Sequence, residues 1–521
     1  MLSRINWIEL LVFLAFFTAF TALGFLASRW HVAKKQTMDD WGLGGRQFGT
    51  LITWFLVGGD FYTAYTIIAV PALVYGVGAA GFFALPYSII VYPFVFAAMP
   101  RLWSVCQKHG LVTPADFVRS RYGSHWLAAA VAITGVLAVM PYIALQLVGM
   151  EVVFTQMGLK ATSALLRDFP ITVAFGVLTV YTYSAGLRAP AFLAFFKDVM
   201  IYIIVIAAIV AIPLRFGGYS RIFHLASAHY AVSSAAGSLI LRPGEYGAYA
   251  SLALGSALAA FMYPHTVTSV LASANGQVIR RNAVFLPAYT LLLGLIAVLG
   301  IAAAASGLLV SENKEAVPAL LASNFPRWFT GFSFAGIAIA ALVPAAIMSI
   351  AAANLFTRNL YLEYLKPHSN DREQTQVAKR ASLVVELGAL FFVLVFPTRY
   401  AVNLQLLGGI WILQTFPAIA LGLWGRWFHH RGLLIGWACG MGLGTYLSYI
   451  QRLQSSTYPI RIAGYSATLY IGLIALALNL LMTLAFSLVF DSLGVPRLQD
   501  ATDDADYLWI EKQALGTKNV L

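Results

Sequence analysis

Residues 50–77 read TLITWFLVGGDFYTAYTIIAVPALVYGV, an apolar stretch long enough to cross a membrane. Its middle carries Gly58 and Gly59, which weaken a helix because glycine loses the most backbone freedom on ordering. Asp60 follows and places a carboxylate at the depth of the lipid. This stretch therefore predicts a membrane helix that is broken near its centre.

A second broken stretch lies five apolar spans further along the chain, in residues 246–274. There Tyr263-Pro264-His265 interrupts the helix, since proline removes a backbone hydrogen bond. Because five is odd, two consecutive five-span units that each begin with a broken helix must be inverted relative to one another. Paired broken helices in inverted repeats are typical of secondary transporters, whose binding sites lie at the breaks.

The composition places the whole chain in a membrane. Of its 521 residues, 60% are hydrophobic and only 10% are charged, and the mean hydropathy is +0.78. Soluble chains carry about 25% charged residues, so a soluble enzyme is excluded. We predict an all-α integral membrane protein with about thirteen transmembrane helices. The apolar runs are 7–26, 50–77, 79–98, 126–157, 171–187, 190–214, 246–274, 283–309, 329–356, 378–396, 400–423, 433–450 and 466–490.

The basic residues predict the orientation in the membrane. Most of the 33 Lys and Arg residues fall in one set of alternate loops. The positive-inside rule then places the N-terminus outside and the C-terminus in the cytoplasm, in a bacterial-type inner membrane. The net charge of +12 is thus a topology signal, and no nucleic acid partner is expected. Cys106 and Cys439 show neither metal-ligand nor disulfide spacing, and no cofactor is expected.

These spans divide the chain into six segments. Residues 1–48 are expected to hold the first helix and a cytoplasmic loop, 49–214 inverted repeat 1, 215–245 an extracellular loop, 246–424 inverted repeat 2, and 425–490 two further helices. The remaining residues, 491–521, are expected to be a solvated cytoplasmic tail that is too short to fold.

Polar residues inside the spans form the candidate coupling site. Asp60, Asp198 and Ser349 lie roughly 11 to 16 Å from the cytoplasmic ends of their spans at ~1.5 Å per residue, so three helices can bring them together. A carboxylate in a span is costly unless it is paired, protonated or hydrated; the alternative is a structural partner for a serine or a helix end. Lys197, about 100° around the helix from Asp198, is expected to have other neighbours or to reach the interface. Glu151 is not assigned.

A second polar group, near mid-depth, is the candidate substrate site. Glutamine can hydrogen-bond a solute and tyrosine adds an aromatic wall, and two pairs of such residues occur at helical spacing in different spans. Each residue alone is equally compatible with hydrogen bonding between helices. The group consists of Thr63, Tyr142, Gln146, His265, Trp411 and Gln414.

Three motifs resemble the solute:sodium symporter family. They are residues 54–60 (WFLVGGD), Phe196-Lys197-Asp198, and residues 346–349 (AIMS) ahead of residues 358–361 (RNLY). Residues 58–65, 140–147 and 263–265 look most like the monocarboxylate uptake permeases that carry lactate, pyruvate and alanine. The resemblance covers residues 5–490. It implies a leucine-transporter-like core of two inverted five-helix repeats, with one extra helix before it and two after it.

The resemblance also implies a sodium site, and here the chain departs from the family pattern. The site would use backbone carbonyls at the first break, near Gly58 and Phe61, together with Ala346, Ser349 and the next residue, which is usually Ser or Thr. That residue is Ile350 here. Because a hard cation prefers oxygen ligands, the sodium site is expected to be weak or absent. The expected ion-coupling group is then Asp60, Lys197, Asp198, Ala346 and Ser349.

The leading hypothesis is a secondary active transporter that imports small monocarboxylates such as pyruvate, lactate or alanine by alternating access. Protons are the expected coupling ion. The alternative is sodium-coupled symport of another small solute, such as an amino acid. An intramembrane aspartyl enzyme would use Asp60 and Asp198, but its tyrosine-aspartate context is absent, and no enzymatic activity is expected. The expected partners are a small organic anion, a coupling cation and the lipid bilayer; the oligomeric state stays open.

Overall fold

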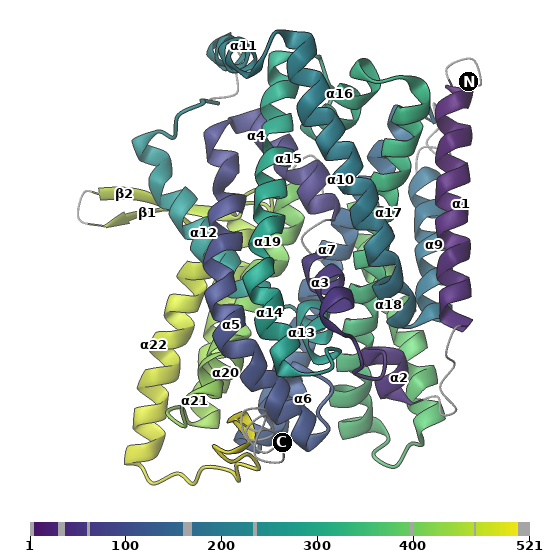
Figure 1. The fold of residues 1–521 in the computed structure, drawn as a ribbon. Helices are drawn as coiled ribbons and strands as arrows, with labels where there is room; N and C mark the ends of the chain where they lie inside the picture. Colours follow the sequence, from purple (N-terminus) through teal and green to yellow (C-terminus); the bar gives the residue numbers. More distant parts are fainter. Residues whose placement is uncertain are drawn as a thin grey trace, which may run out of the picture.

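The computed structural model describes residues 5–29, 37–59, 63–159, 169–232, 237–395, 401–462 and 465–508. This part of the chain is a helical bundle with a two-stranded sheet at one side (Figure 1). Its α-helices are α1 (Trp7–Arg29), α2 (Met38–Leu43), α3 (Thr50–Gly59), α4 (Val70–Val77), α5 (Ala84–His109), α6 (Pro114–Tyr122), α7 (His125–Gln156), α9 (Phe169–Ala185), α10 (Arg188–Phe216), α11 (Tyr219–Val232), α12 (Tyr246–Ala260), α13 (Pro264–Leu271), α14 (Gly276–Phe285), α15 (Pro287–Ala305), α16 (Ala316–Asn324), α17 (Arg327–Phe356), α18 (Asp371–Val395), α19 (Ala401–Ile412), α20 (Phe416–Ile419), α21 (His430–Ile450) and α22 (Ile471–Ser492).

Shorter elements connect these helices. The π-helical turns are η2 (Tyr65–Ala69) and η6 (Thr357–Leu365). The 3-10 turns are η3 (Ala79–Phe83), η4 (Pro243–Glu245), η5 (Asn313–Glu315), η8 (Leu413–Thr415), η9 (Leu421–Leu423) and η10 (Asp506–Leu508), and the strands are β1 (Thr457–Ile462) and β2 (Tyr465–Tyr470).

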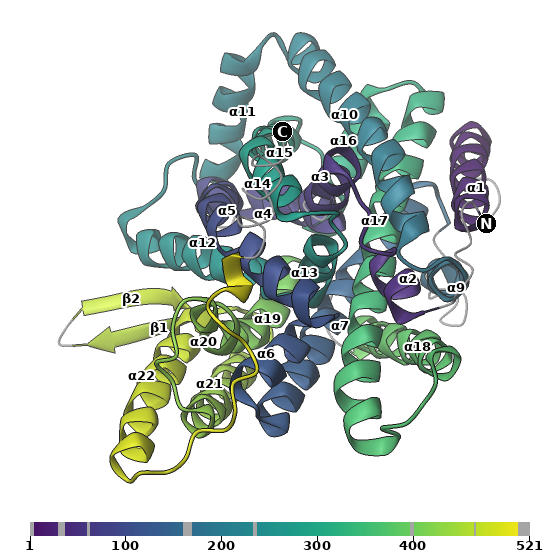
Figure 2. The ribbon, with the colours of Figure 1, turned by 60° about the horizontal axis from the view of Figure 1, so that its bottom comes forward.

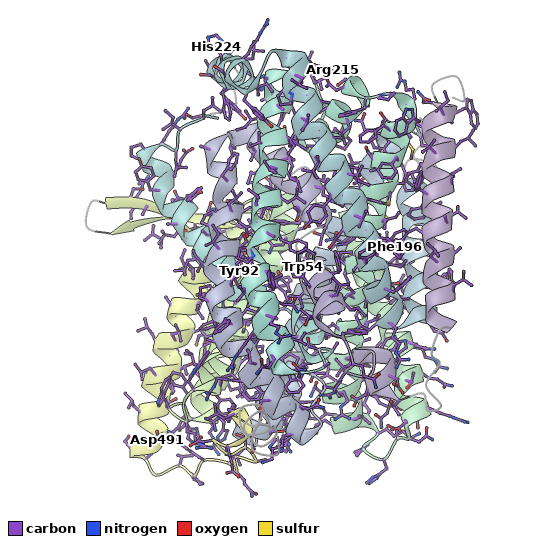
Figure 3. The ribbon with its side chains drawn as sticks, in the orientation of Figure 1. Trp54, Tyr92, Phe196, Arg215, His224 and Asp491 are labelled. Atoms are coloured by element: carbon purple, nitrogen blue, oxygen red, sulfur yellow. The ribbon has the colours of Figure 1, made fainter. Side chains whose placement is uncertain are left out.

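Within the described residues, nine helices are long and apolar enough to cross a membrane. The other predicted spans fall on helices that are broken, short or polar at one end: α3 with η2 and α4, α12 with α13, the 17-residue α9, and α18. The total of thirteen crossings therefore stays a prediction. Arg215 and His224 lie at one end of the bundle and Asp491 at the other, whereas Trp54 and Tyr92 lie between them (Figure 3).

Both predicted helix breaks are present. α3 ends at Gly59 and the chain is described again from Thr63, just before η2. α12 ends at Ala260, and α13 begins at Pro264 after Tyr263 has taken an extended conformation (φ −61°, ψ 134°). Proline suits the first position of α13, because its missing N–H would have had no partner there.

α17 is the central helix of the bundle, and its membrane-spanning segment is completely buried. It packs against α1, α7, α10 and α18 (Figure 2). Small residues let neighbouring backbones approach it: a Cβ on Gly331 would meet the Glu9 carbonyl oxygen at 2.5 Å. The polar side chains in the membrane-spanning segment of α17 therefore face protein and not lipid.

A hairpin replaces the start of the last predicted span. β1 and β2 are antiparallel and pair Thr457 with Tyr470, and α22 begins only at Ile471. The prediction of a span from residue 466 was thus wrong at its start. Alternating residues such as those in TYPIRI fit a pleated strand, and apolarity alone does not distinguish them from the end of a helix. The predicted loop 215–245 likewise contains a helix, α11.

Residues 495–508, here called the tail segment, are mostly exposed, as expected of a solvated tail, but Thr502, Asp506 and Tyr507 are buried against the bundle, which was not predicted. The tail segment crosses the end of the bundle that holds α6 (Figure 2). Asp506 and Tyr507 are only 1% and 4% exposed. The Tyr507 ring meets Phe117 edge-on and lies beneath the Arg101 and Arg121 guanidinium groups. The tail segment docks although it contains few apolar residues, because charged and aromatic contacts hold it against the bundle.

Ion pairs connect the tail segment to two helices and to the loop before α21. Asp506 pairs with Lys108 and with His109 Nε2 (2.7 Å) on α5, and Asp500 pairs with Arg121 of α6 and with Arg426 Nε (2.8 Å). Burial by itself raises the pKa of Asp506, but the Asp503 N–H, Lys108 and His109 outweigh it and lower this pKa to about 2.

We expect docking of the tail segment to weaken in acid. Because the pKa of Asp506 is depressed in the folded protein, its contribution is complete above about pH 4 and is lost as the pH falls towards 2. Replacing Asp506 with Asn should release the segment at neutral pH, as measured by proteolysis after residue 495. Asp504→Asn is the control, because this side chain is 89% exposed. Equal cleavage of both variants would contradict the expectation.

Candidate functional site

A small cavity lies beside the second helix break. It measures about 30 Å³, which is room for about two waters. Its lining comes from α5, α7, α12, the break itself, α13 and α19: Tyr87, Tyr142, Ser256, Ala260, Tyr263, His265, Thr266 and Gln405. Five helices and a break thus converge on one space in the interior of the bundle.

Three polar atoms among these lining residues have no hydrogen-bond partner in the described part of the chain. They are Ser256 Oγ, His265 Nδ1 and Gln405 Oε1, and all are buried. Buried polar groups are nearly always satisfied, and each one left without a partner costs free energy. Three unsatisfied groups around one cavity therefore indicate a place for a polar ligand.

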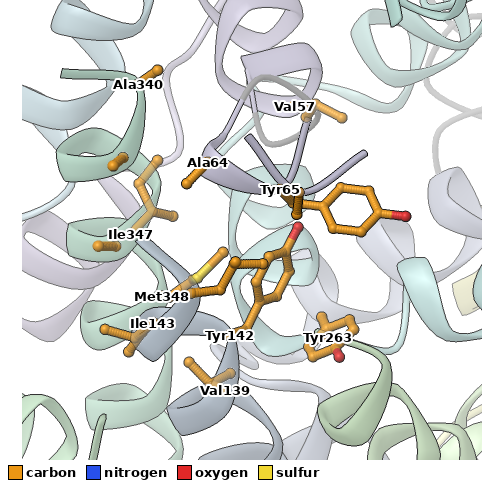
Figure 4. Packing of buried hydrophobic residues seen from close by; sticks show 14 of the residues in the cluster. Val57, Ala64, Tyr65, Val139, Tyr142, Ile143, Tyr263, Ala340, Ile347 and Met348 are labelled. Carbon is orange, nitrogen blue, oxygen red and sulfur yellow. The ribbon is translucent and has the colours of Figure 1, made fainter. Parts of the chain in front are cut away.

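Aromatic rings form the wall of the same cavity. The Tyr142, Tyr263 and His265 ring centroids lie 5.3 to 5.5 Å apart. The Tyr263 hydroxyl donates to the Gln405 carbonyl oxygen (2.9 Å), which ties the break to α19. Figure 4 shows Tyr65, from the turn after the first break, beside Tyr142 and Tyr263. Both breaks therefore meet at this level of the bundle.

α13 directs its N-terminus to the cavity through His265 and Thr266. The first N–H groups of a helix have no intrahelical partner and carry a partial positive charge. Together with the unpaired Ser256 hydroxyl, these donors suit a small anion. Among the described residues, the lining includes no lysine or arginine, and the donors that it offers to an anion are neutral.

Two residues of the predicted substrate group hold the first break together. Gln146 Oε1 accepts from the Ala64 N–H (2.9 Å), and Gln146 Nε2 donates to the Tyr142 carbonyl oxygen (3.3 Å). Thr63 Oγ1 accepts from the Tyr65 N–H (3.0 Å). These side chains cap the helix that follows the break, so the structure gives them backbone partners in place of an open cavity.

Trp411 and Gln414 lie towards the C-terminal helices. The Trp411 indole donates to Thr445 of α21 (3.1 Å). Gln414 donates to the Ile410 carbonyl oxygen (2.9 Å) and accepts from Asn479 of α22 (3.2 Å). The structure therefore brings Tyr142 and His265 together at the cavity. Trp411 and Gln414 lie elsewhere, at contacts with α21 and α22.

Lys197 and Asp198 meet the end of α3, and both are fully buried. Lys197 Nζ donates to the Gly59 carbonyl oxygen (2.7 Å) and lies 3.1 Å from Asp198 Oδ1. The Tyr289 hydroxyl donates to Asp198 Oδ2 (2.7 Å). The two neighbours were expected to face different surroundings, but the long lysine side chain folds back and reaches both the break and its neighbour.

The glycines before the first break permit this close approach. A Cβ on Gly58 would lie 2.2 Å from the Tyr289 ring, whereas one on Gly59 would lie 3.1 Å from Lys197 Nζ. The last turn of α3 is thus pressed against Tyr289 and the ion pair. Asp60 and Phe61, which belong to the predicted coupling group and sodium site, lie outside the described residues.

Ser349 and Ile350 sit on α17 in different surroundings. The Ser349 hydroxyl donates to the Ala345 carbonyl oxygen (2.9 Å), and Ala346 and Ser349 are both fully buried. Ile350 packs into an apolar cluster with Met38 and Trp41 of α2. At the position where the family pattern has a hydroxyl, this chain therefore makes an apolar contact between helices.

The structure adds several residues to those predicted from the sequence. Glu386, on α18, is a fully buried carboxylate whose Oε2 accepts from Thr179 Oγ1 (2.8 Å). It lies within the predicted span 378–396, so the rule that identified Asp60 and Asp198 applied to it equally. Ser256 and Gln405 were missed because each is a single polar residue, and nothing in the sequence shows that α12 and α19 meet.

A larger cavity, of about 160 Å³, lies under the tail segment. Its basic lining residues Arg121 and Arg426 are both paired with Asp500. Arg497 is paired with Asp491. Far from both breaks and with its charges already compensated, this cavity is a gap in the packing of the tail segment and not the candidate site.

Comparisons of this sequence with a family model and with known proteins all match it to transporters. The model of the sodium:solute symporter family matches residues 41–440. A Rhizobium johnstonii protein named monocarboxylate transport permease protein is 55% identical over 483 residues, which are 92% of this chain and 96% of that protein. A Bacillus subtilis protein, the uncharacterized symporter YodF, is 32% identical over 444 residues, 84% of this chain and 86% of its own.

Among solved structures, the chain resembles a substrate-bound, outward-open Na+-coupled sialic acid symporter. The TM-score is 0.73 over 95% of this chain and 99% of that one, at 14% sequence identity. At this identity the likeness concerns the fold alone.

Proposed function

Because the chain belongs to the sodium:solute symporter family, we propose that it imports small monocarboxylates such as pyruvate, lactate or alanine by alternating access, with protons as the coupling ion. Proteins of this family and the relatives above are transporters, so the chain is a multi-pass membrane symporter and not an enzyme. The hypothesis of an intramembrane aspartyl protease is therefore dropped.

The observation that carries the substrate proposal is the cavity at the second break. Its donors are Ser256 and the N-terminus of α13, and its walls are tyrosine rings, an arrangement that suits one carboxylate on a short apolar body. The name of the Rhizobium relative supports the same class of substrate. At about 30 Å³ the cavity is smaller than a three-carbon acid, so binding would require the breaks to move apart.

The proposal of protons rests on Lys197. Its ammonium donates to the Gly59 carbonyl oxygen, the kind of ligand that the family pattern assigns to sodium at the first break. A fixed positive charge there would repel a cation, and Ile350 adds no oxygen ligand. The predicted orientation, N-terminus outside in a bacterial inner membrane, would let the inward proton gradient drive import.

Transport by purified protein in proteoliposomes tests the proposal. We expect saturable uptake of labelled pyruvate, lactate or alanine under an inward proton gradient without sodium. Empty liposomes and a gradient collapsed by a protonophore are the controls. Uptake of an amino acid other than alanine that requires sodium and saturates with it would instead support the alternative, sodium-coupled symport of another solute.

We expect Ser256→Ala to weaken substrate binding without weakening the fold. Its hydroxyl has no partner among the described residues, so folding loses nothing, whereas a hydrogen bond to a carboxylate contributes about 1.5 to 3 kcal/mol. The apparent KM should therefore rise roughly ten- to a hundredfold.

Ser251→Ala is the matched control on the same helix. The Ser251 hydroxyl accepts from the Tyr470 N–H (2.9 Å) and donates to the Gly247 carbonyl oxygen (2.6 Å). This variant should lower the melting temperature and leave the KM unchanged. The cavity would not be the substrate site if Ser256→Ala kept the wild-type KM and Ser251→Ala raised it.

A further inference from the structure

The membrane bundle contains a second buried carboxylate, Glu386, whose surroundings differ from those of Asp198. Both side chains are fully buried. Asp198 has Lys197 Nζ at 3.1 Å as a counter-charge, but Glu386 makes no ion pair with any described residue. A buried charge is costly unless it is paired, so the two carboxylates have different requirements.

Hydroxyl groups from two other helices surround Glu386. Thr179 Oγ1 of α9 donates to Oε2 (2.8 Å), and the hydroxyls of Thr182 and Ser349 lie beside the carboxyl group. Thr182 Oγ1 has no hydrogen-bond partner among the described residues. Oε1 nevertheless has no well-aligned partner. Since Ser349 donates its own hydrogen to Ala345, it presents lone pairs to this space. The result is an oxygen-lined site from α9, α17 and α18.

The charged groups on the elements around α18 are engaged elsewhere. α9 has no charged residue between Phe169 and Ala185, and Arg380 of α18 is exposed. The remaining interactions are Asp39 and Asp40 of α2 with Arg46 and Arg188, Arg358 of η6 with Asp116, His125 of α7 with Glu363, Glu151 of α7 with Lys314, Arg327 of α17 with Glu9, and Lys379 of α18 over the Tyr183 ring.

We propose that the coupling cation binds at Glu386, in a site completed by Thr179, Thr182 and Ser349. A carboxylate without a counter-charge at membrane depth requires a cation, and hydroxyl oxygens suit either a proton or a hard alkali ion. Asp198 has no such requirement, because Lys197 already balances it. The proposal rests on the symport proposed above and moves the ion site from the first break to the α9–α17–α18 contact.

Occupancy of the site would depend on the conformation of the protein, because α17 contributes one of its hydroxyls. Ser349 belongs to the central helix, whereas Thr179 and Thr182 belong to α9, so the three hydroxyls surround the carboxylate only while these helices keep their present contact. Loss of the cation would leave a bare carboxylate at this contact and favour its opening. Binding of the cation and movement of the helices are thereby linked.

Glu386→Gln in the full-length protein tests the proposal, because glutamine keeps the shape and an acceptor oxygen for Thr179 but has no negative charge to balance a cation and takes up no proton. We expect accumulation of labelled pyruvate driven by an inward proton gradient to fall at least tenfold. Exchange of labelled for unlabelled pyruvate without any gradient should continue, because it needs no net ion movement. Ser382→Ala is the control: this buried hydroxyl on the same helix donates to the Lys379 carbonyl oxygen (2.8 Å).

Two gradient arms distinguish the ion. Accumulation driven by protons without sodium that is lost in Glu386→Gln identifies a proton at the site. Accumulation driven by sodium at equal pH on both sides that is lost in the same variant identifies sodium. Gradient-driven accumulation that is unchanged in Glu386→Gln would overturn the site.

A second measurement does not depend on the substrate. The melting temperature of the purified wild type should shift with pH or with sodium concentration by an amount that Glu386→Gln lacks, and Thr179→Val should reduce this shift. Equal shifts in wild type and Glu386→Gln would overturn the site even if transport is found. If the wild type transports no monocarboxylate, the proposed function is contradicted. The comparison of melting-temperature shifts between wild type and Glu386→Gln would still show whether a cation binds at Glu386. If Glu386→Gln does not fold, the melting-temperature shifts of Thr182→Val and Thr179→Val are compared with those of the wild type instead.

Discussion

Lys197→Met should abolish transport and lower the yield of folded protein. Among the described residues, Lys197 is the only counter-charge of Asp198, and it also donates to the Gly59 carbonyl oxygen; the substitution removes both interactions. Leaving one partner of a buried ion pair uncompensated costs about 3 to 5 kcal/mol, a large part of the stability of most proteins. We expect a lower melting temperature and uptake at background level.

The double variant Lys197→Met/Asp198→Asn separates folding from function. With both charges gone no unpaired charge remains, so stability should recover most of the loss. Transport should stay absent if the ammonium at the first break is needed for the cycle. Recovery of transport together with stability would show that the pair is only structural, and sodium-dependent transport in the double variant would show that Lys197 stands in for the ion.

Gly58→Ala should be nearly as damaging, for a steric reason. The added Cβ would lie 2.2 Å from the Tyr289 ring, a distance that such atoms do not adopt, so α3 or Tyr289 must move. Tyr289 holds Asp198 through its hydroxyl, and a displacement there disturbs the ion pair as well. Overpacking of a tight core costs about 1 to 3 kcal/mol of folding free energy, so the melting temperature should fall. Uptake should fall as well, because the break and the ion pair are displaced together.

The neighbouring glycine provides the control for this prediction. In Gly59→Ala the new Cβ would meet the flexible end of Lys197 at 3.1 Å, which can shift by a few tenths of an ångström. Its effect on uptake and on the melting temperature should be clearly smaller. Equal losses in both variants would mean that the flexibility of glycine at the break, and not contact with Tyr289, sets the requirement.

The sequence predicted the features of the fold that depend on local chemistry. Glycine and proline within apolar runs marked both breaks. Their separation by five spans predicts two inverted repeats, and this division of the chain stays a prediction. The start of α22 was misplaced because Ser466–Tyr470 is as apolar as a helix end, and its pairing with β1 is a contact between segments. The tail segment was missed because ion pairs with α5 and α6 hold it, and composition does not reveal such partners.

The candidate site was predictable only in part, for the same reason. Tyr142 and His265 were found because they lie beside breaks or at helical spacing. Gln146 has side-chain chemistry that suits a solute, yet its Oε1 accepts from the Ala64 N–H, a contact that is visible only in the folded structure. Ser256 and Gln405 belong to the candidate site because Ser256 Oγ and Gln405 Oε1 have no hydrogen-bond partner among the described residues. Such an unsatisfied atom cannot be recognised from the sequence, since the positions of all neighbouring atoms must be known.

The pairing of the tail segment has a consequence for how the protein is made. A ribosome produces Arg121 and Arg426 long before Asp500, so both arginines emerge with no acidic partner from the tail. During membrane insertion their charges are therefore free to hold these loops on one side of the bilayer. Asp500 and Asp506 are synthesised later and pair with Arg121, Arg426, Lys108 and His109 once the tail segment docks. In the predicted orientation, the same basic residues would act first as topology signals and afterwards as anchors of the tail segment.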